Sequence, residues 1–176
     1  MTENIIQTLF PQVKYTIDQL EKKYPPRNLP ANVIVSRIAP SPTGFMHIGN
    51  FYSALISERL AHQSDGIFFL RIEDTDKKRE VKGAKKLIIN SLNNYQITYD
   101  EGPTINNSEK GEYGPYIQSQ RAEIYQSIVK HLLKNNLAYV CFATPEELKK
   151  VNEQQKKTKS VQDIMVNGLY GEKKVT

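Results

Sequence analysis

The chain of 176 residues has one cysteine, no tryptophan and no long hydrophobic run. Its lone Cys141 excludes an internal disulfide framework and is typical of a reducing compartment. No apolar run approaches the ~18 residues of a membrane-spanning helix, and residues 1–10 have no basic segment of the kind that begins a secretory leader. We therefore expect a cytoplasmic monomer without a membrane partner, long enough to form a core without a metal.

A strong excess of charge of one sign is also absent. Lys and Arg number 24 against 19 Asp and Glu, which gives a net charge of +5. This excess favours polyanions but is spread along the chain, so no basic arm or acidic tail is predicted. Charge alone therefore does not identify a nucleic-acid binder.

The first 32 residues are predicted to form an N-terminal helical extension followed by a linker. Residues 3–22 carry apolar side chains at helical intervals, with Pro11 near a start or a kink: Ile6, Leu9, Phe10, Val13, Ile17 and Leu20. We expect one amphipathic helix there. Residues 24–30 contain three prolines and predict a stiff linker that cannot continue the helix.

Residues 33–142 show strands and helices in alternation. Residues 33–35 and 66–72 have the apolar character of buried strands, and residues 49–63 and 81–94 have helical spacing. Two buried strands joined by a helix predict a right-handed parallel crossover in an α/β sheet.

Weaker signals follow. Residues 100–118 are rich in Gly, Pro and Asn and predict a loop, residues 120–136 predict a helix, and residues 138–142 could form a third strand. Thr144 and Glu147 have the spacing of a capping box at the start of a lysine-rich helix. We expect residues 143–176 to form a separate segment that begins with this helix.

The turn after the first strand lies where α/β sheets place their ligands. Asn50 and Phe51 replace the Lys and the hydroxyl residue of a P-loop, and no G-x-G-x-x-G is present, so both of these nucleotide motifs are excluded. His47 and Gly49 remain at the opening of a helix, whose N–H groups favour phosphate oxygens. A nucleotide site and a merely structural histidine are both compatible with this spacing.

The string R-I-A-P-S-P-T-G-F-M-H-I-G-N at residues 37–50, followed by R-I-E-D-T-D at residues 71–76, resembles the first signature of class I aminoacyl-tRNA synthetases. More narrowly, it is similar to glutamyl-tRNA synthetases, with Asn50 in place of the second His of the signature. The resemblance implies a Rossmann-like parallel sheet with flanking helices, of which residues 33–142 would form the first half of the nucleotide-binding fold.

The implied activity is that of a glutamate–tRNA ligase in translation. Such an enzyme activates L-glutamate with ATP, taken as its Mg²⁺ complex, and transfers the glutamyl group from the adenylate to the terminal ribose of tRNA(Glu). The resemblance assigns glutamate binding to Arg37, Ala39, Ser41 and Glu73. It assigns ATP binding to Pro40, His47 and Gly49, catalysis to His47, Gly49 and Asn50, and the tRNA acceptor end to Arg79.

Chemistry supports part of this assignment independently. Parallel strands end at one edge of a sheet, so Arg37 and Glu73 should face a shared crevice. A guanidinium can bind a carboxylate with two hydrogen bonds, and a carboxylate can accept from an ammonium group. The alternative is an Arg37–Glu73 ion pair that only supports the sheet. The charged turn formed by residues 74–79 could similarly contact RNA or be merely solvated, and Ser119 could cap the next helix.

Two sequence features resemble functional motifs of the family, but their context argues against those functions. Some members of the family hold zinc through a Cys-x-Cys pair, but Cys141 is followed by Phe142 and Ala143, so we predict no metal and a small core role for Cys141. Residues 156–160, K-K-T-K-S, resemble the second class I signature. Their place soon after Glu147 favours the end of a lysine-rich helix instead.

The resemblance also implies that residues 143–176 begin an acceptor-end insertion and that the chain is an incomplete catalytic fragment, inactive alone in aminoacylation. Alternatives are a shortened paralogue that glutamylates a modified base of an aspartate tRNA, a glutaminyl enzyme, and a non-catalytic RNA-binding module on the same scaffold. Thr75 and residues 99–103 favour the full ligase over the paralogue.

Overall fold

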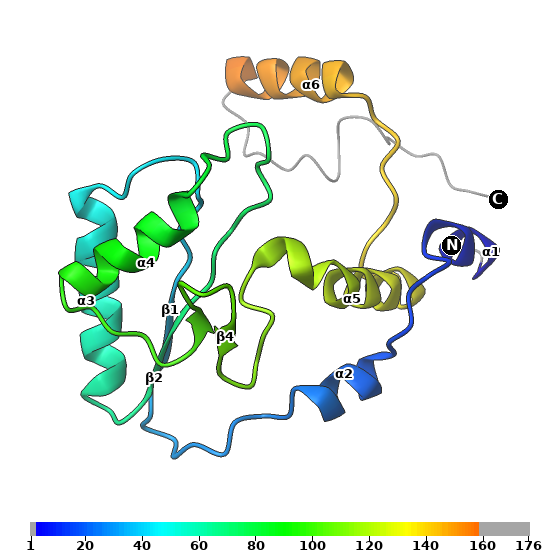
Figure 1. Ribbon diagram of the computed structural model, residues 1–176. Helices are drawn as coiled ribbons and strands as arrows, with labels where there is room; N and C mark the ends of the chain where they lie inside the picture. Colours follow the sequence, from blue (N-terminus) through cyan, green and yellow to red (C-terminus); the bar gives the residue numbers. More distant parts are fainter. Residues whose placement is uncertain (1–2, 159–176) are drawn as a thin grey trace. The chain divides into compact units, whose positions relative to one another are not determined.

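Two parallel strands, β1 (Val35–Ile38) and β2 (Ile67–Leu70), flank the helix α3 (Ile48–His62) in the sequence and form the predicted crossover. The computed structural model describes residues 3–158 of the chain (Figure 1). The chain divides into two units, with the boundary after Leu137. In the described part, no helix is long and apolar enough to cross a membrane.

Strand β1 begins two residues later than predicted. It pairs only with β2 among the described residues, in a register that places Arg37 opposite Phe69. Ile34, just before the strand, and Val35 are each 41% exposed instead of buried. The prediction of a buried strand over residues 33–35 was wrong because apolar, β-branched composition does not reveal whether other elements cover both faces of a strand.

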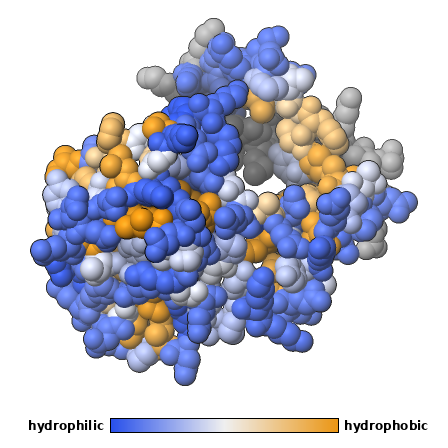
Figure 2. Space-filling view, viewed as in Figure 1, coloured by the Kyte–Doolittle hydropathy of each residue, from blue (hydrophilic) through white to orange (hydrophobic). Residues whose placement is uncertain are grey.

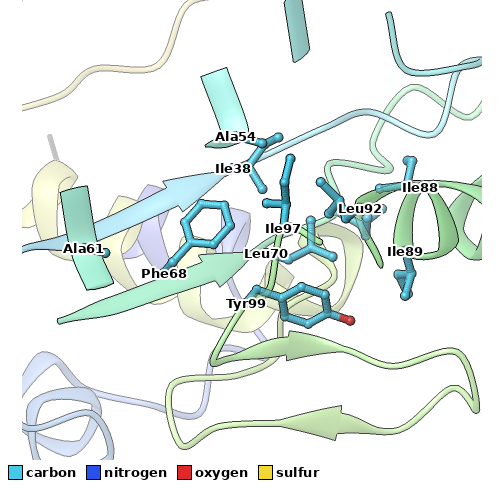
Figure 3. Close-up of a cluster of buried hydrophobic side chains, with 11 residues drawn as sticks. Ile38, Ala54, Ala61, Phe68, Leu70, Ile88, Ile89, Leu92, Ile97 and Tyr99 are labelled. Atoms are coloured by element: carbon cyan, nitrogen blue, oxygen red, sulfur yellow. The ribbon is translucent and has the colours of Figure 1, made fainter. Parts of the chain in front are cut away.

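The hydrophobic core lies between the sheet and the helices α3 and α4 (Ala84–Asn94) (Figure 3). Phe68, Leu70 and Ile72 alternate onto this face of β2 and its extension, and α4 covers them with Ile88, Ile89 and Leu92. The helix α4 begins three residues later than predicted. Gly83, with φ of +84°, occupies its N-cap in a left-handed conformation and sets the start.

The N-terminal extension contains two short helices, α1 (Glu3–Leu9) and α2 (Ile17–Lys23), so the prediction of one helix was wrong. Pro11 cannot donate a helical hydrogen bond, and the chain restarts at a capping box. There the Gln19 backbone N–H donates to Thr16 Oγ1 at 3.3 Å, and the Thr16 N–H donates to Gln19 Oε1 at 2.9 Å. Both helices contact α5 (Ala122–Lys134).

Residues 101–117 add short strands that the sequence pattern did not reveal. β3 (Gly102–Pro103) and β4 (Glu109–Lys110) form an antiparallel hairpin, and parallel bridges join Phe69 to Glu101 and Ile72 to Ile117. Strands of two residues are too short to show an alternation. The predicted helix over residues 120–136 is confirmed as α5, preceded by a 3₁₀ turn, η1 (Gln118–Arg121).

In the second unit, α6 (Pro145–Thr158) begins at the predicted capping box. The Thr144 N–H donates to Glu147 Oε2 at 2.7 Å, and the Glu147 N–H donates to Thr144 Oγ1 at 3.2 Å. Residues 156–158 lie in this helix, as predicted, whereas residues 159–160 fall outside the described part. Residues 138–142 form no strand, so no neighbouring strand covers Cys141, and its exposure contradicts the predicted core role.

A histidine bridges α3 to the segment after α4. His62 Nδ1 lies 3.0 Å from Glu58 Oε1, and His62 Nε2 lies 2.9 Å from Asp100 Oδ2. Asp100 also accepts the Phe68 N–H at 2.8 Å, and Glu58 is buried. The hydrogen bond to Asp100, followed by the charges of Asp100 and Glu58, raises the pKa of His62.

This bridge predicts a pH-dependent stability. A folded-state pKa above the unfolded value stabilises the protein below about pH 6.5, and the contribution disappears as the pH rises through the higher folded-state pKa. We expect urea unfolding to show a loss of about 1 kcal/mol between pH 6 and 8.5. The His62→Gln variant should lack this loss, and an equal loss in the variant would contradict the assignment.

Candidate active site

The backbone pairing of β1 and β2 continues past the strands and brings two loops side by side. The Glu73 N–H donates to the Pro40 carbonyl at 3.0 Å, and the Val81 N–H donates to the Pro42 carbonyl at 2.9 Å. Residues 39–41 therefore run along the segment that carries Glu73. The predicted meeting of the two strand ends is confirmed by these hydrogen bonds.

Glu73 lies between two arginines. Its Oε1 atom accepts a hydrogen bond from Arg71 Nη2 at 2.7 Å and is 4.0 Å from Arg37 Nη1. Arg37 lies within β1 rather than after it, opposite Phe69. Because side chains alternate along a strand, Phe69, Arg71 and Glu73 point away from the face occupied by the core. Sequence reasoning missed Arg71, although its spacing of two residues from Glu73 was a usable signal.

The Arg37 guanidinium is available for a ligand. Its side chain is 41% exposed, and it makes no hydrogen bond within residues 3–158. Glu73, 29% exposed, is held instead by Arg71, so the merely supporting Arg37–Glu73 pair is at most a weak contact. A guanidinium and an oriented carboxylate side by side can bind the two opposite charges of an amino acid.

His47 is the N-cap of α3, and its imidazole is oriented by the helix. The Gly49 N–H donates to His47 Nδ1 at 3.1 Å, and the His47 N–H donates to Asn50 Oδ1 at 3.0 Å. Since Nδ1 accepts, the proton of the neutral imidazole lies on Nε2, which can donate to a ligand. Asn50 thus has a capping role that a side-chain amide can perform where the signature has a second His.

Gly49 is adjacent to the imidazole ring. A Cβ built on Gly49 would lie 3.0 Å from His47 Cε1 and 3.1 Å from its Nδ1. Any larger residue would require the ring to shift by a few tenths of an ångström. This packing constraint is separate from the expected contact of Gly49 with ATP, which stays a prediction. Among the described residues, no hydrogen bond or ion pair joins His47 to Arg37 or Glu73.

The charged turn after Glu73 is anchored at one residue and exposed at another. Asp74, 7% exposed, accepts from the Ser119 N–H at 2.8 Å and the Ser119 hydroxyl at 2.6 Å. Burial alone would raise the pKa of Asp74, but the bonds from Ser119 and Lys77 outweigh burial and lower it. Ser119 therefore binds the turn and caps no helix, contrary to the prediction. Arg79, 76% exposed, donates from Nε to Asp76 Oδ2 at 2.6 Å.

Arg27 attaches the linker to the face of the sheet on which Arg71 and Glu73 lie. Arg27 Nη1 and Nη2 donate to the two carboxylate oxygens of Glu101 at 2.7 and 2.6 Å, and the Tyr116 hydroxyl donates to Glu101 Oε2 at 2.6 Å. The guanidinium also stacks 3.8 Å from the centre of the Tyr113 ring. These residues, with Arg71, line a cavity of about 230 Å³ that sequence reasoning missed, because its walls come from distant segments.

No group of three or more His, Cys, Asp or Glu side chains in residues 3–158 has the geometry to hold a metal ion. The absence of zinc stays a prediction.

A parallel β-α-β crossover with charged side chains at its strand ends and a histidine at the following helix N-terminus defines an α/β ligand-binding domain. Residues 33–168 match the family described as tRNA synthetases class I (E and Q), catalytic domain, and the chain belongs to this family. This membership confirms the predicted class I synthetase fold.

The individual relatives are named as glutamate–tRNA ligases or synthetases. The glutamate–tRNA ligase of Clostridium perfringens is 51% identical over 170 residues, which cover 97% of this chain and 30% of that protein. The ligase of Acetivibrio thermocellus is 51% identical over 170 residues, covering 96% of this chain and 30% of that protein. The crystal structure of a glutamate–tRNA synthetase from Elizabethkingia anophelis has a TM-score of 0.63 at 38% identity, over 73% of this chain and 25% of that one. The chain thus spans about 30% of the length of these curated relatives.

Proposed function

We propose that this chain supplies one half of the active site of a glutamate–tRNA ligase. The observation that carries the proposal is the placement of Glu73 between Arg37 and Arg71, next to the loop that leads to His47. The names of the relatives support glutamate as the amino acid and tRNA(Glu) as the acceptor.

The amino acid would bind at the strand ends. Arg71 occupies Glu73 Oε1, which leaves Oε2 to accept from the α-ammonium group of glutamate. The Arg37 fork would bind a carboxylate of the same molecule with two hydrogen bonds. Ala39 and Ser41 lie on the loop alongside Glu73, where they would contact the ligand.

ATP, as its magnesium complex, would bind at the start of α3. His47 Nε2 would donate to a phosphate oxygen while Nδ1 remains bound to the Gly49 N–H. Pro40 and Gly49 would border the nucleotide. Asn50 would act as a positioning residue through the backbone of His47.

The reaction consists of two displacements. An oxygen of the glutamate α-carboxylate attacks the α-phosphorus of ATP, and pyrophosphate leaves. A hydroxyl of the 3′-terminal adenosine of tRNA then attacks the carbonyl carbon of the adenylate, and AMP leaves. Both steps depend on positioning and on stabilisation of phosphate charge, for which Arg37 and His47 are suitable groups. Arg79 would give up its ion pair with Asp76 and contact the acceptor end of the tRNA instead.

Titration with a non-hydrolysable glutamyl-adenylate analogue tests the proposal. The wild-type chain is expected to bind the analogue in calorimetry, and Glu73→Gln should weaken binding at least about 10-fold because it removes one charge-assisted hydrogen bond. Glu80→Gln is the matched control, since Glu80 pairs with the exposed Lys77 side chain. Equal affinity of the wild type and Glu73→Gln would contradict the proposed site.

A further inference from the structure

A cavity of about 270 Å³ lies where the N-terminal extension meets α5. One wall comes from the segment between α1 and α2 and the start of α2, and the other from one face of α5. The lining residues are Val13, Lys14, Tyr15, Thr16, Ile17, Ser127, Lys130, His131 and Lys134. We name this cavity the extension pocket.

The extension pocket is lined by cations and by no carboxylate. Lys14 is exposed and has no ion-pair partner within residues 3–158. Lys130 Nζ donates to the neutral amide of Gln7, with Nζ 3.1 Å from Oε1. Lys14 and Lys130, which have no acidic partner within residues 3–158, create a positive potential at the cavity that attracts an anion.

The walls of the pocket are ordered by packing that does not involve the lysines. Ile6 of α1, Leu20 of α2 and Leu133 of α5 are buried at 2%, 6% and 3% exposure, respectively. The capping box at Thr16 sets the start of α2, and Lys23 lies 5.0 Å from the centre of the Tyr15 ring. The Tyr15 ring is partly buried, and the Lys23 ammonium group lies over one of its faces.

The N-terminal wall of the pocket lies outside the matched family domain, whereas its α5 wall lies inside it. The family match begins at residue 33, so Lys14 and Tyr15 lie outside the shared catalytic domain. In Figure 1, α5 and α2 lie on the other side of the two strands from α3, whose N-cap residue is His47. Arg37, His47 and Glu73 are not among the residues that line the extension pocket, so a ligand there would contact a different set of residues from the reacting end of a substrate.

We propose that the extension pocket binds the sugar–phosphate backbone of RNA, and this inference rests on the proposed function, whose substrate is a tRNA. The cavity has room for about nine waters at ~30 Å³ each, which is more than one phosphate ion needs. Lys14 and Lys130, on two different segments, suit successive phosphates. The extension thus gives the chain an RNA contact away from the acceptor end.

Fluorescence anisotropy with a labelled tRNA(Glu) transcript, over a range of salt concentrations, tests the inference. The double variant Lys14→Ala/Lys130→Ala should weaken binding about 10-fold at low salt. It should also reduce the slope of log affinity against log salt by about 1.5, because two phosphate contacts are lost. The matched control Lys85→Ala/Lys86→Ala on α4 removes the same charge and should change the affinity less than about 2-fold.

Three results would overturn the inference: no binding of tRNA by the wild-type chain, equal losses in the two double variants, or calorimetric binding of inorganic phosphate that depends on Lys14 and Lys130 while RNA binding does not. Circular dichroism verifies that both double variants are folded. The proposed function is tested separately, because Glu73→Gln should lose the adenylate analogue and keep tRNA. The pocket variant should bind the analogue as the wild type does and show the weakened binding of tRNA.

Discussion

Replacing Arg27 with methionine is expected to lower the free energy of unfolding of the first unit by about 2–3 kcal/mol. The variant would leave Glu101 without its cation in a site where the side chain is 10% exposed. The stack on Tyr113 would also lose its charge. Methionine keeps much of the apolar volume, so the loss reports mainly on the ion pair.

The stability that the Arg27–Glu101 pair contributes depends on pH. Burial alone would raise the pKa of Glu101, but the hydrogen bonds from Arg27 and Tyr116 outweigh burial and lower it. A lowered folded-state pKa stabilises the protein above about pH 4, and this contribution is lost as the pH falls through the folded-state value. In that acidic range, the difference in free energy of unfolding between the wild type and the Arg27→Met variant should largely disappear.

Urea unfolding at pH 7, followed by circular dichroism, measures the effect. Arg79→Met is a matched control because the Arg79 side chain is 76% exposed, and a change of at most about 0.5 kcal/mol is expected. Arg27→Met/Glu101→Gln should recover part of the loss, since the amide carries no charge and can still accept from Tyr116. Wild-type stability in the single variant would show that this ion pair does not hold the linker.

Loss of the His47 imidazole is expected to lower kcat/KM for aminoacylation by about 10²–10³-fold. The measurement uses a chimaera in which this chain replaces the 170 residues of the Clostridium perfringens ligase that it matches. The parent chimaera should aminoacylate tRNA(Glu). His47→Ala would remove both the Nε2 donor and the N-cap acceptor of α3.

A second substitution separates these two roles. Serine is a good N-cap residue but is too short to place a donor where His47 Nε2 lies. His47→Ser should therefore retain the stability that His47→Ala loses, about 1 kcal/mol, and be equally inactive. Activity of His47→Ser near that of the parent chimaera would show that His47 acts only as a cap.

Several apolar side chains at and near the start of α3 and along it are exposed. Phe45 and Ile48 are 87% and 78% exposed, and Leu60 is 49% exposed. Figure 2 shows apolar patches in an otherwise hydrophilic surface, including the region near the start of α3. Patches of this kind mark surfaces that other protein segments cover.

Sequence patterns were most informative where the decisive contacts are local. The start of α6 was predictable because Thr144 and Glu147 are one turn apart. The crossover was predictable because its apolar runs and helical spacing are contiguous. The break between α1 and α2 was missed because the apolar spacing continued through Pro11, although the backbone there could not remain helical.

The sequence by itself determined the family resemblance, the crossover and the residues that reach the strand ends, because these depend on short strings with a characteristic chemistry. Only the tertiary structure decided that Arg71 holds Glu73, that Asp74 binds Ser119 and that Arg27 binds Glu101. The last two pairs join residues 45 and 74 positions apart. Which polar group a buried carboxylate meets depends on how the elements pack, and no local periodicity records that choice.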